Sequence, residues 1–214
     1  KSTREKYYMK EAINIDLADK ATHGLPLDWV KKDKTPCCNV TVENNVFDST
    51  TRGVGTHKYS QNSKGENIYH QNITIRNNEF KNIHDNGVFV LNWKNTKIGN
   101  SSKKSYSSGA HAISGGGIEE INITGNTFTK IKRNPVYFCI QQNVGGGSNY
   151  KKVGMKITKE ETKAMLDNKV SDCGYDMNSI FHGYDILYFK GSGERTRSNA
   201  VGVNINKQII SYGL

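Results

Sequence analysis

Short alternations of apolar and polar residues recur along the chain. Three of them align without a gap: Val40–Phe47, Ile73–Phe80 and Ile121–Phe128. Each segment begins with an apolar-polar-apolar alternation, which is the side-chain period of a β-strand. Each then continues through a polar turn that contains Asn or Gly, residues that adopt left-handed backbone readily, and ends on Phe. The pattern predicts three strands, each followed by a tight turn.

A second strand-like segment follows each phenylalanine after six or seven residues. The alternation near the N-terminus, at 12–16, fits the same pattern, and a further short segment covers 95–98. We expect the extra residues between these segments to form loops at 60–67 and at 99–117. The second segments are Gly53–His57, Gly87–Leu91 and Pro135–Cys139.

This repetition predicts an all-β fold of the right-handed parallel β-helix (solenoid) type. One circuit of such a chain cannot bury its narrow apolar stripe, whereas stacked circuits can. We expect the recurring asparagines to form a hydrogen-bonded ladder at the turn, and the phenylalanines to stack inside. A β-sandwich or an antiparallel barrel is the alternative, but it does not explain an Asn-Asn-x-Phe pattern at one phase. The residues concerned are Asn45, Asn78, Asn126, Phe47, Phe80 and Phe128.

The sequence also resembles a known superfamily. The run Asn-(Val/Ile)-Thr-(Val/Ile)-x-Asn-Asn-x-Phe at 39–47 and 72–80, followed by Gly-(Val/Ile), is similar to the pectate-lyase-like proteins, whose fold is the right-handed parallel β-helix. The resemblance covers residues 11–142. It implies the fold but not one activity, because the superfamily contains polysaccharide lyases, glycoside hydrolases, uronate epimerases and non-catalytic surface proteins.

The C-terminal third departs from the repeat. Residues 143–150 are Gly-rich and predict a loop, and Thr158 with Glu161 forms a capping-box pattern before a helix at 160–169. Strands are expected at 183–190 and 201–211. We interpret residues 1–214 as one domain, with clear repeats at 11–142 and irregular terminal coils or a cap at 143–214. The abrupt start at Lys1 also admits a fragment of a longer chain.

Alignment of the second segments divides their residues between two faces. The predicted inner face carries Ile13, Val54, Val88 and Val136, followed by Ile15, Thr56, Val90 and Phe138. The predicted outer face carries Asn14, Gly55, Phe89 and Tyr137, followed by Asp16, His57, Leu91 and Cys139. Asp16 and His57 would then lie on neighbouring strands, with Arg52 close to both.

These three polar residues are our catalytic candidates. A carboxylate beside an imidazole orients it and raises its pKa, so His57 could act as the base in β-elimination from a uronate, with Asp16 as its partner. Arg52 could neutralise the substrate carboxylate. An ordinary Asp16–His57 or Arg52–Glu11 ion pair is the competing interpretation. The substrate-binding candidates are Asn14, Lys58, Tyr59, Phe89, Trp93 and Tyr137.

Hydrolysis of a glycosidic bond would require a different arrangement. Two carboxyl groups must flank the scissile bond, and Asp16 with Glu11 or with Asp85 is the local choice. No histidine or cysteine spacing is typical of a metal site, so we expect neither a metal nor another cofactor. We expect the cysteines to be small buried residues rather than disulfides or zinc ligands: Cys37, Cys38, Cys139 and Cys173.

Composition narrows the choice of partner. Hydrophobic residues make up only 35% of the chain, Gly is abundant (21), and the formal net charge is +10. A positive surplus favours acidic partners, but no nucleic-acid-binding motif is present and no apolar run is long enough to span a membrane. We therefore expect a monomeric, secreted or cell-surface protein whose partner is a polysaccharide or cell-surface glycan.

Three functional hypotheses follow. The first is a lyase-like domain that acts on an acidic, uronate-type glycan. The second is a non-catalytic glycan-binding or adhesin-type module of a bacterial surface protein. The third is a glycoside hydrolase with a carboxylate pair.

Overall fold

The fold was analysed in a computed structural model. It describes residues 11–17, 35–56, 61–62, 64–104, 111–139, 141–143, 150–152, 154–175, 183–191 and 195–214. Strands dominate these ranges, and the helical elements are one short α-helix, α2 (Lys159–Ala164), and one 3-10 turn, η1 (Arg197–Asn199). The predicted all-β class is therefore confirmed. Among the described residues, no helix has the length and hydrophobicity needed to cross a membrane.

The largest sheet has 11 strands and mixed strand directions. Its long path runs β1-β4-β7-β9-β11-β16-β17-β18, while β2, β5 and β14 pair at the side of this path. The strands on the path are β1 (Glu11–Asn14), β4 (Arg52–Gly55), β7 (Val88–Gly99), β9 (Ile113–Thr124), β11 (Val136–Phe138), β16 (Ile186–Phe189), β17 (Ala200–Asn204) and β18 (Ile209–Tyr212). The side strands are β2 (Cys38–Glu43), β5 (His70–Arg76) and β14 (Met155–Lys156).

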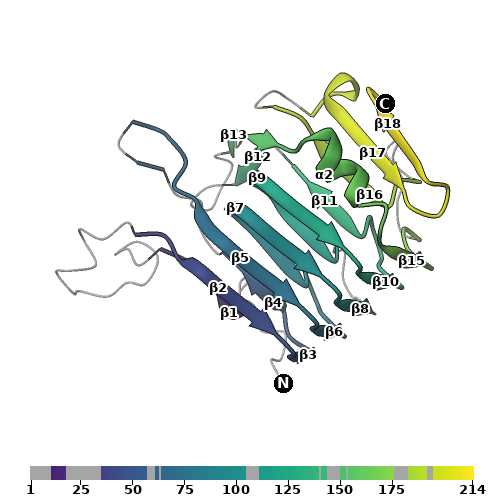
Figure 1. Ribbon diagram of the computed structural model, residues 1–214, viewed down its shortest axis with the longest axis horizontal. Helices are drawn as coiled ribbons and strands as arrows, with labels where there is room; N and C mark the ends of the chain where they lie inside the picture. The colour runs from purple at the N-terminus through teal and green to yellow at the C-terminus, as the bar shows by residue number, and fades with distance from the viewer. Residues whose placement is uncertain are drawn as a thin grey trace.

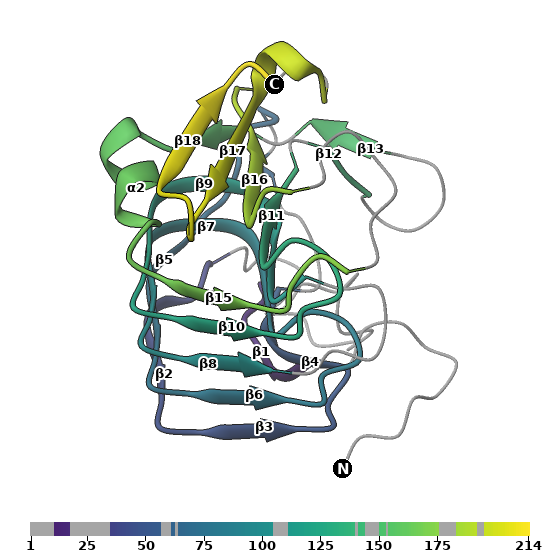
Figure 2. The same cartoon turned by 90° about the vertical axis from the view of Figure 1, so that its right-hand side faces the viewer.

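A five-stranded sheet with the order β15-β10-β8-β6-β3 is parallel throughout. Its strands lie one above the next in Figure 2, with β3 at one end and β15 at the other. A short antiparallel pair, β12 with β13, completes the strand pairing. The bounds are β3 (Val46–Asp48), β6 (Glu79–Lys81), β8 (Ser102–Lys104), β10 (Thr127–Thr129), β15 (Lys169–Ser171), β12 (Gln141–Asn143) and β13 (Tyr150–Lys152).

The 11-stranded sheet has two limbs, because β7 and β9 are long and change direction part-way. We call the strand path through β1, β4, 88–91, 113–116, β11 and β16 the first limb, and the path through β2, β5, 93–99, 118–124 and β14 the second limb (Figure 1). Asn92 and Gly117 lie between the limbs and have positive φ angles of 55° and 64°. This left-handed backbone interrupts the alternation of the strands.

The predicted inner column is confirmed and contains one residue that the alignment missed. Ile13 pairs with Val54, Val54 with Val88, and Val136 faces the same column. Ile113 of β9 lies between Val88 and Val136. Each of the four from Val54 to Val136 is 0% exposed, so the β-branched side chains build the core beneath the first limb.

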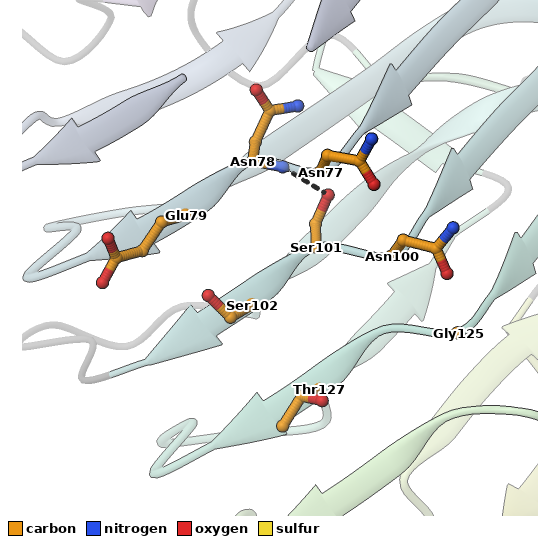
Figure 3. A pocket seen from close by; sticks show the side chains of 8 residues that line it. All are labelled: Asn77, Asn78, Glu79, Asn100, Ser101, Ser102, Gly125 and Thr127. Atoms are coloured by element: carbon orange, nitrogen blue, oxygen red, sulfur yellow. Dashed lines mark hydrogen bonds between the residues drawn. The ribbon is translucent and has the colours of Figure 1, made fainter. Parts of the chain in front are cut away.

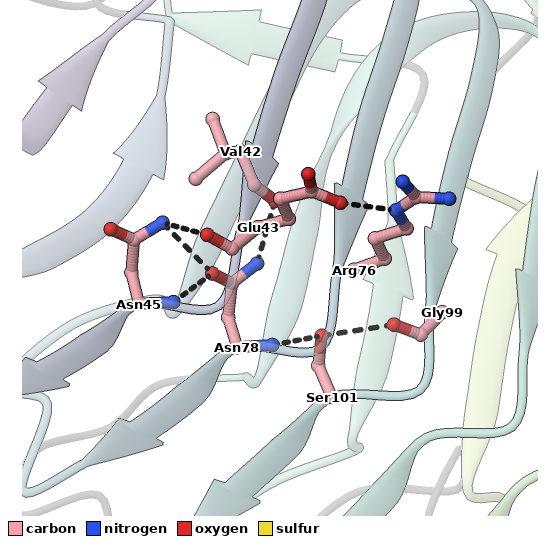
Figure 4. Close-up of polar contacts among 7 residues, drawn as sticks. All are labelled: Val42, Glu43, Asn45, Arg76, Asn78, Gly99 and Ser101. Carbon is pink, nitrogen blue, oxygen red and sulfur yellow. Dashed lines mark hydrogen bonds and ion pairs between the residues drawn. The ribbon is translucent and has the colours of Figure 1, made fainter.

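The asparagine ladder forms at the turn between the second limb and the five-stranded sheet (Figure 4). Asn78 Oδ1 accepts from the backbone N–H of Asn45 at 2.9 Å and from Asn45 Nδ2 at 3.2 Å, while Asn78 Nδ2 donates to Val42 O at 2.8 Å. The backbone N–H of Asn78 donates to the hydroxyl of Ser101 at 3.2 Å. The buried turn groups of successive strands therefore satisfy one another rather than water.

The ladder continues beyond the residues that the sequence predicted. Ser101 N–H donates to Asn126 Oδ1 at 3.3 Å, and the backbone N–H of Asn126 donates to Asn168 Oδ1 at 2.9 Å. Asn126 Nδ2 donates to Ile98 O at 2.9 Å, and Asn168 Nδ2 donates to Ile123 O at 2.8 Å. Ser101 and Asn168 thus occupy positions equivalent to the asparagines of the repeat.

The phenylalanine stack is only partly as predicted. Phe47 and Phe80 stack with their ring centroids 4.7 Å apart and their planes 12° from parallel. Phe128 is fully buried, but it is not the neighbour of Phe80, because Lys103 of β8 pairs between them in the register. The expected loop at 99–117 is likewise wrong where it is described: β8 and the start of β9 lie there, and Gly115–Gly117 belong to β9.

The C-terminal third contains the predicted helix and strands with different bounds. Both reciprocal bonds of the capping box form, with Glu161 N–H to Thr158 Oγ1 at 3.1 Å and Thr158 N–H to Glu161 Oε2 at 2.7 Å. The single strand expected at 201–211 is instead the antiparallel hairpin of β17 and β18. The four cysteines are all free thiols, and Cys139 is buried while Cys38 is exposed.

The ladder leads to a stability prediction. Asn126→Ala should lower the free energy of unfolding by about 3 kcal/mol, because it leaves Ser101 N–H and Ile98 O buried without that partner. Asn45→Ala, at the exposed end of the same ladder, should cost less than about 1 kcal/mol. Guanidinium denaturation of both variants measures the difference, and equal losses would contradict the ladder as a buried hydrogen-bond network.

Candidate functional site

The outer face of the first limb carries three of the predicted substrate-binding residues in one line. Asn14 pairs with Gly55, Gly55 with Phe89, Phe89 with Ser114, and Ser114 with Tyr137. Adjacent strands lie about 4.8 Å apart, so Phe89 and Tyr137 are separated by about 10 Å along this line. The two rings are partly exposed, whereas Ser114 between them is buried.

Arg52 lies beside this line in a compact ion cluster. Its Nε donates to Asp85 Oδ2 at 2.6 Å and its Nη1 donates to Glu11 Oε1 at 3.0 Å. The guanidinium also lies 4.2 Å from the centroid of the Phe89 ring, which is a cation–π distance. Gly53 follows Arg52 at a place where a Cβ atom would collide with the Phe80 ring, so the chain needs glycine there.

These contacts argue against the predicted role of Arg52 as the group that neutralises a uronate carboxylate. The side chains of Arg52 and Glu11 are only 10% and 3% exposed, and that of Asp85 is 37% exposed. Two carboxylates already neutralise this guanidinium, so it is not a spare cation for a uronate. The competing interpretation, an Arg52–Glu11 ion pair, is confirmed, with Asp85 as a third member.

Tyr137 is held from two sides. The His111 ring stacks on it at a centroid distance of 4.7 Å and 14° from parallel, and Phe189 meets it edge-on at 6.3 Å. Nη1 of the exposed Arg195 donates to the Tyr137 hydroxyl at 3.4 Å. Burial raises the pKa of Tyr137, so its hydroxyl remains protonated at neutral pH. Tyr137 is thus a fixed aromatic ring with a cation at its polar end.

His111 is neutral at physiological pH. Burial lowers its pKa to about 4. Its Nδ1 donates to the carbonyl oxygen of Asn134 at 2.8 Å, because a carbonyl can only accept. This bond fixes the tautomer and the ring orientation. His111 therefore supports Tyr137 as a flat ring rather than as a charge.

Trp93 does not belong to this surface. It is 0% exposed, and its Nε1 donates to Thr56 Oγ1 at 2.6 Å, while Thr56 Oγ1 donates to Ile15 O at 2.7 Å. The prediction of an outward sugar platform failed because the positive φ of Asn92 breaks the strand alternation just before Trp93. Trp93 instead fills the core between the two limbs.

Of the predicted acid–base pair, Asp16 and His57, the structure describes only Asp16. Asp16 follows β1 and is partly buried, and its carbonyl oxygen accepts from the thiol of Cys37 at 3.4 Å. His57, Lys58 and Tyr59 lie outside the described residues. The backbone N–H of Ile15 donates to Gly55 O, which continues the β1–β4 pairing as far as Thr56.

A second polar cluster lies on the outer face of the second limb. Glu119 accepts from the Tyr69 hydroxyl at 3.0 Å and contacts Lys156 at 2.5 Å and Lys94 at 3.4 Å. Burial alone would raise the pKa of Glu119, but the hydrogen bonds from Lys156 and Tyr69 hold it below its ordinary value. Each of these charged groups has an oppositely charged partner. Among the described residues, this cluster has no stacked rings like those at Tyr137.

Metal chemistry finds no support in the ranges that the structure describes. No three His, Cys, Asp or Glu side chains converge there as metal ligands would. His70 is 2% exposed, and its Nδ1 accepts from the backbone N–H of Cys37 at 3.1 Å. Burial lowers the pKa of His70 to about 4, so it is neutral as well.

Sequence reasoning missed His111 and Arg195 as members of the site. The sequence contains a signal for His111, because it lies two residues before Ile113, as Arg52 lies two before Val54. The predicted loop at 99–117 concealed this signal. Arg195 comes from the C-terminal third, where no repeat predicts its position. Its approach to Tyr137 spans 58 residues of sequence.

Comparison with known proteins does not identify this arrangement. No family model matches the chain, and neither the curated proteins nor the solved structures contain a match.

Removal of the Arg52 charge should lower the stability of the fold, because the buried Glu11 carboxylate then loses its ion-pair partner. Arg52→Met should destabilise the fold by about 3 kcal/mol, because it leaves a nearly buried carboxylate without its partner. Arg76→Met is the matched control: Arg76 also binds a carboxylate, Glu43, at 2.6 Å, but both side chains are exposed, and the loss should stay below about 1 kcal/mol. Denaturant midpoints that fall equally for both variants would refute the cluster.

The two neutral histidines predict a pH dependence of stability. Their folded-state pKa values of about 4 lie below the unfolded value of about 6.5, so the unfolded chain binds more protons between these limits. The free energy of unfolding should therefore fall as the pH is lowered from 7 to 5. His70→Asn keeps an acceptor but cannot titrate, so it should flatten this dependence. Denaturation at several pH values tests this, and an unchanged slope would contradict it.

Proposed function

We propose that the chain is a right-handed parallel β-helix that binds an acidic polysaccharide lengthwise along the outer face of the first limb. One observation carries the proposal: Phe89 and Tyr137 occupy one register column, and Arg195 lies at the hydroxyl end of Tyr137. A linear polymer can follow such a column across several strands. Binding outside the cell or at its surface agrees with such a ligand.

The strand pairing supports the β-helix part of the proposal. Consecutive strands 33 residues apart pair in parallel and in register on two sheets, as Val40 with Ile73 and Phe47 with Phe80 do. The asparagine ladder fixes the turn between these sheets. The antiparallel β17–β18 hairpin then covers the C-terminal end, as a solenoid end requires.

The rings support the polysaccharide part. Aromatic side chains offer apolar faces to the CH groups of a sugar, and their binding contribution is larger when their orientation is already fixed. Arg52 holds Phe89 from one side, and His111 holds Tyr137 from one side. Both rings are therefore preorganised while remaining partly exposed.

The acidic character of the ligand rests on Arg195 and on the overall charge. Arg195 is exposed beside the ring, so it replaces Arg52 in our proposal as the group that meets a uronate carboxylate. The net charge of +10 adds a long-range attraction for a polyanion.

A lyase-like reaction on the same glycan is the second candidate. It is favoured by the position of Asp16: the residue before it, Ile15, accepts at its carbonyl oxygen from the Thr56 hydroxyl, and Thr56 directly precedes His57 in the sequence. In this reaction His57 would remove the proton next to the uronate carboxylate, and Asp16 would orient the imidazole. The electron pair of that C–H bond forms a C=C bond as the neighbouring carbon loses its bond to the glycosidic oxygen, which leaves with a proton from water. The hydrolase hypothesis receives no such support, since both carboxyl groups offered beside Asp16 are bound to Arg52: Glu11 is almost fully buried against it, and Asp85 accepts from its Nε at 2.6 Å.

The binding proposal predicts the effect of removing the ring. Tyr137→Ala should weaken binding of a galacturonate hexamer by about tenfold or more, which corresponds to about 1.4 kcal/mol. Tyr212→Ala is the matched control, because Tyr212 is an exposed ring with its own cation, Lys190, at 4.3 Å, yet it lies on the edge strand β18. Isothermal titration calorimetry measures both affinities.

The same samples separate binding from turnover. Formation of unsaturated ends, read as new ultraviolet absorbance and lost in His57→Ala, would support the lyase-like reaction. Binding without that absorbance would leave a non-catalytic module. Equal affinity of wild type and Tyr137→Ala would refute the binding surface.

A further inference from the structure

A polar pocket of about 420 Å³ lies away from the first limb, where three successive turns enter the five-stranded sheet (Figure 3). All its side chains are polar, and none is aromatic or aliphatic. Pockets of a few hundred Å³ are at the small end of the range for small-molecule sites. The lining residues are Asn77, Asn78, Glu79, Asn100, Ser101, Ser102, Gly125 and Thr127.

Two of the lining residues are smaller than those at the equivalent positions of other turns. Asn44, Asn77 and Asn100 hold the left-handed position of three successive turns, with φ angles of 59°, 55° and 49°. Gly125 holds the fourth, with φ 67°, and a Cβ atom there would meet Asn100 Oδ1. Ser101 likewise takes a ladder position that Asn fills elsewhere. Gly125 and Ser101 thus line the pocket with little or no side chain of their own.

The floor of the pocket is rigid. Asn78 and Ser101 are each 2% exposed, and their side chains hydrogen-bond within the ladder. Such a floor does not collapse when the pocket is empty, because each of its polar groups already has a partner.

The rim offers hydrogen-bonding groups to a ligand. Asn77, Asn100, Ser102 and Thr127 are exposed amides and hydroxyls, and they come from three neighbouring strands or turns. Glu79 is the only charged lining residue, and it is 3.6 Å from Lys81. These amides and hydroxyls suit a ligand that has many hydroxyls and no charge. The Glu79 carboxylate disfavours a second carboxylate beside it.

We propose that this pocket binds one uncharged, hydroxylated sugar residue. Its residues are separate from Phe89, Tyr137 and Arg195, so the site is independent of the acidic-polysaccharide surface. In the pocket, ring hydroxyls of the sugar replace water on the Asn77, Asn100, Ser102 and Thr127 side chains. The absence of an aromatic face makes this a weak site.

Two variants fill the pocket without reaching the ladder floor. Gly125→Asn places in the fourth turn the residue that the other three turns carry, and asparagine tolerates the left-handed backbone. Its Cβ atom also displaces the Asn100 amide from the rim of the pocket. Ser102→Gln fills the pocket from an exposed position of β8 and does not depend on that turn. Val46→Gln is the control: Val46 is 60% exposed in the same register column, next to Glu79, but it does not line the pocket.

The experiment is a ¹H–¹⁵N NMR titration of the whole chain with cellohexaose, and with the galacturonate hexamer as the charged comparison. Cellohexaose should shift the side-chain amides of Asn77 and Asn100, and each filling variant should weaken this binding roughly fivefold or more, as the loss of one or two hydrogen bonds would. Val46→Gln should bind as wild type does.

The outcomes separate the two proposals. Shifts at Asn77 and Asn100 that persist in Tyr137→Ala support the pocket even if the first-limb surface binds nothing. The pocket is refuted if cellohexaose causes no shift there, if both folded filling variants bind as well as wild type, or if Tyr137→Ala abolishes the shifts. Tighter binding of the galacturonate hexamer in the pocket would refute the uncharged ligand.

Discussion

The buried side-chain amides at one turn are the interaction on which the rest of the structure depends. Where the chain leaves the second limb for the five-stranded sheet, its backbone groups lose their strand partners and are too deep for solvent. Asn78, Asn126 and Asn168 replace those partners, since each accepts a backbone N–H from the preceding turn and donates to a strand carbonyl. An unpaired group at such depth would cost about 1–3 kcal/mol, so the amides fix which turn lies next to which.

A fixed turn also fixes the register of the strands that it joins. A slip of one residue would move the buried column of Val54, Val88 and Val136 to the outside, so the ladder and the core specify the same pairing. The outer column that contains Phe89 and Tyr137 is a consequence of this pairing. The candidate binding surface is therefore built on parallel strands, which hold its rings more rigidly than a loop would.

The ion cluster around Arg52 positions a side chain of the candidate surface and contributes less clearly to stability. A nearly buried Arg–Glu pair is weak evidence for stability, because desolvation offsets much of the attraction. Its clear structural effect is to hold Phe89 beneath the guanidinium, with Glu11 buried behind it and Asp85 at the exposed side of the cluster. The polar pocket depends on the ladder as well, because Asn78 and Ser101 form its floor. It lies where Gly125 takes the place that asparagine holds in the other turns.

The sequence alone determined the strands with clear alternation and the turns with asparagine, because side-chain period and turn chemistry are local properties. It also predicted that 40–47 stacks on 73–80, because the same pattern returns there at the same phase. It could not reveal that Ser101 and Asn168 join the ladder, since neither stands in an Asn-Asn-x-Phe context. Only the tertiary structure turned Trp93 inward, through the left-handed backbone of Asn92. Tertiary structure also brought Asp85 to Arg52, beside its predicted partner Glu11, and brought Arg195 to Tyr137, because these contacts depend on how distant segments stack and not on the local pattern.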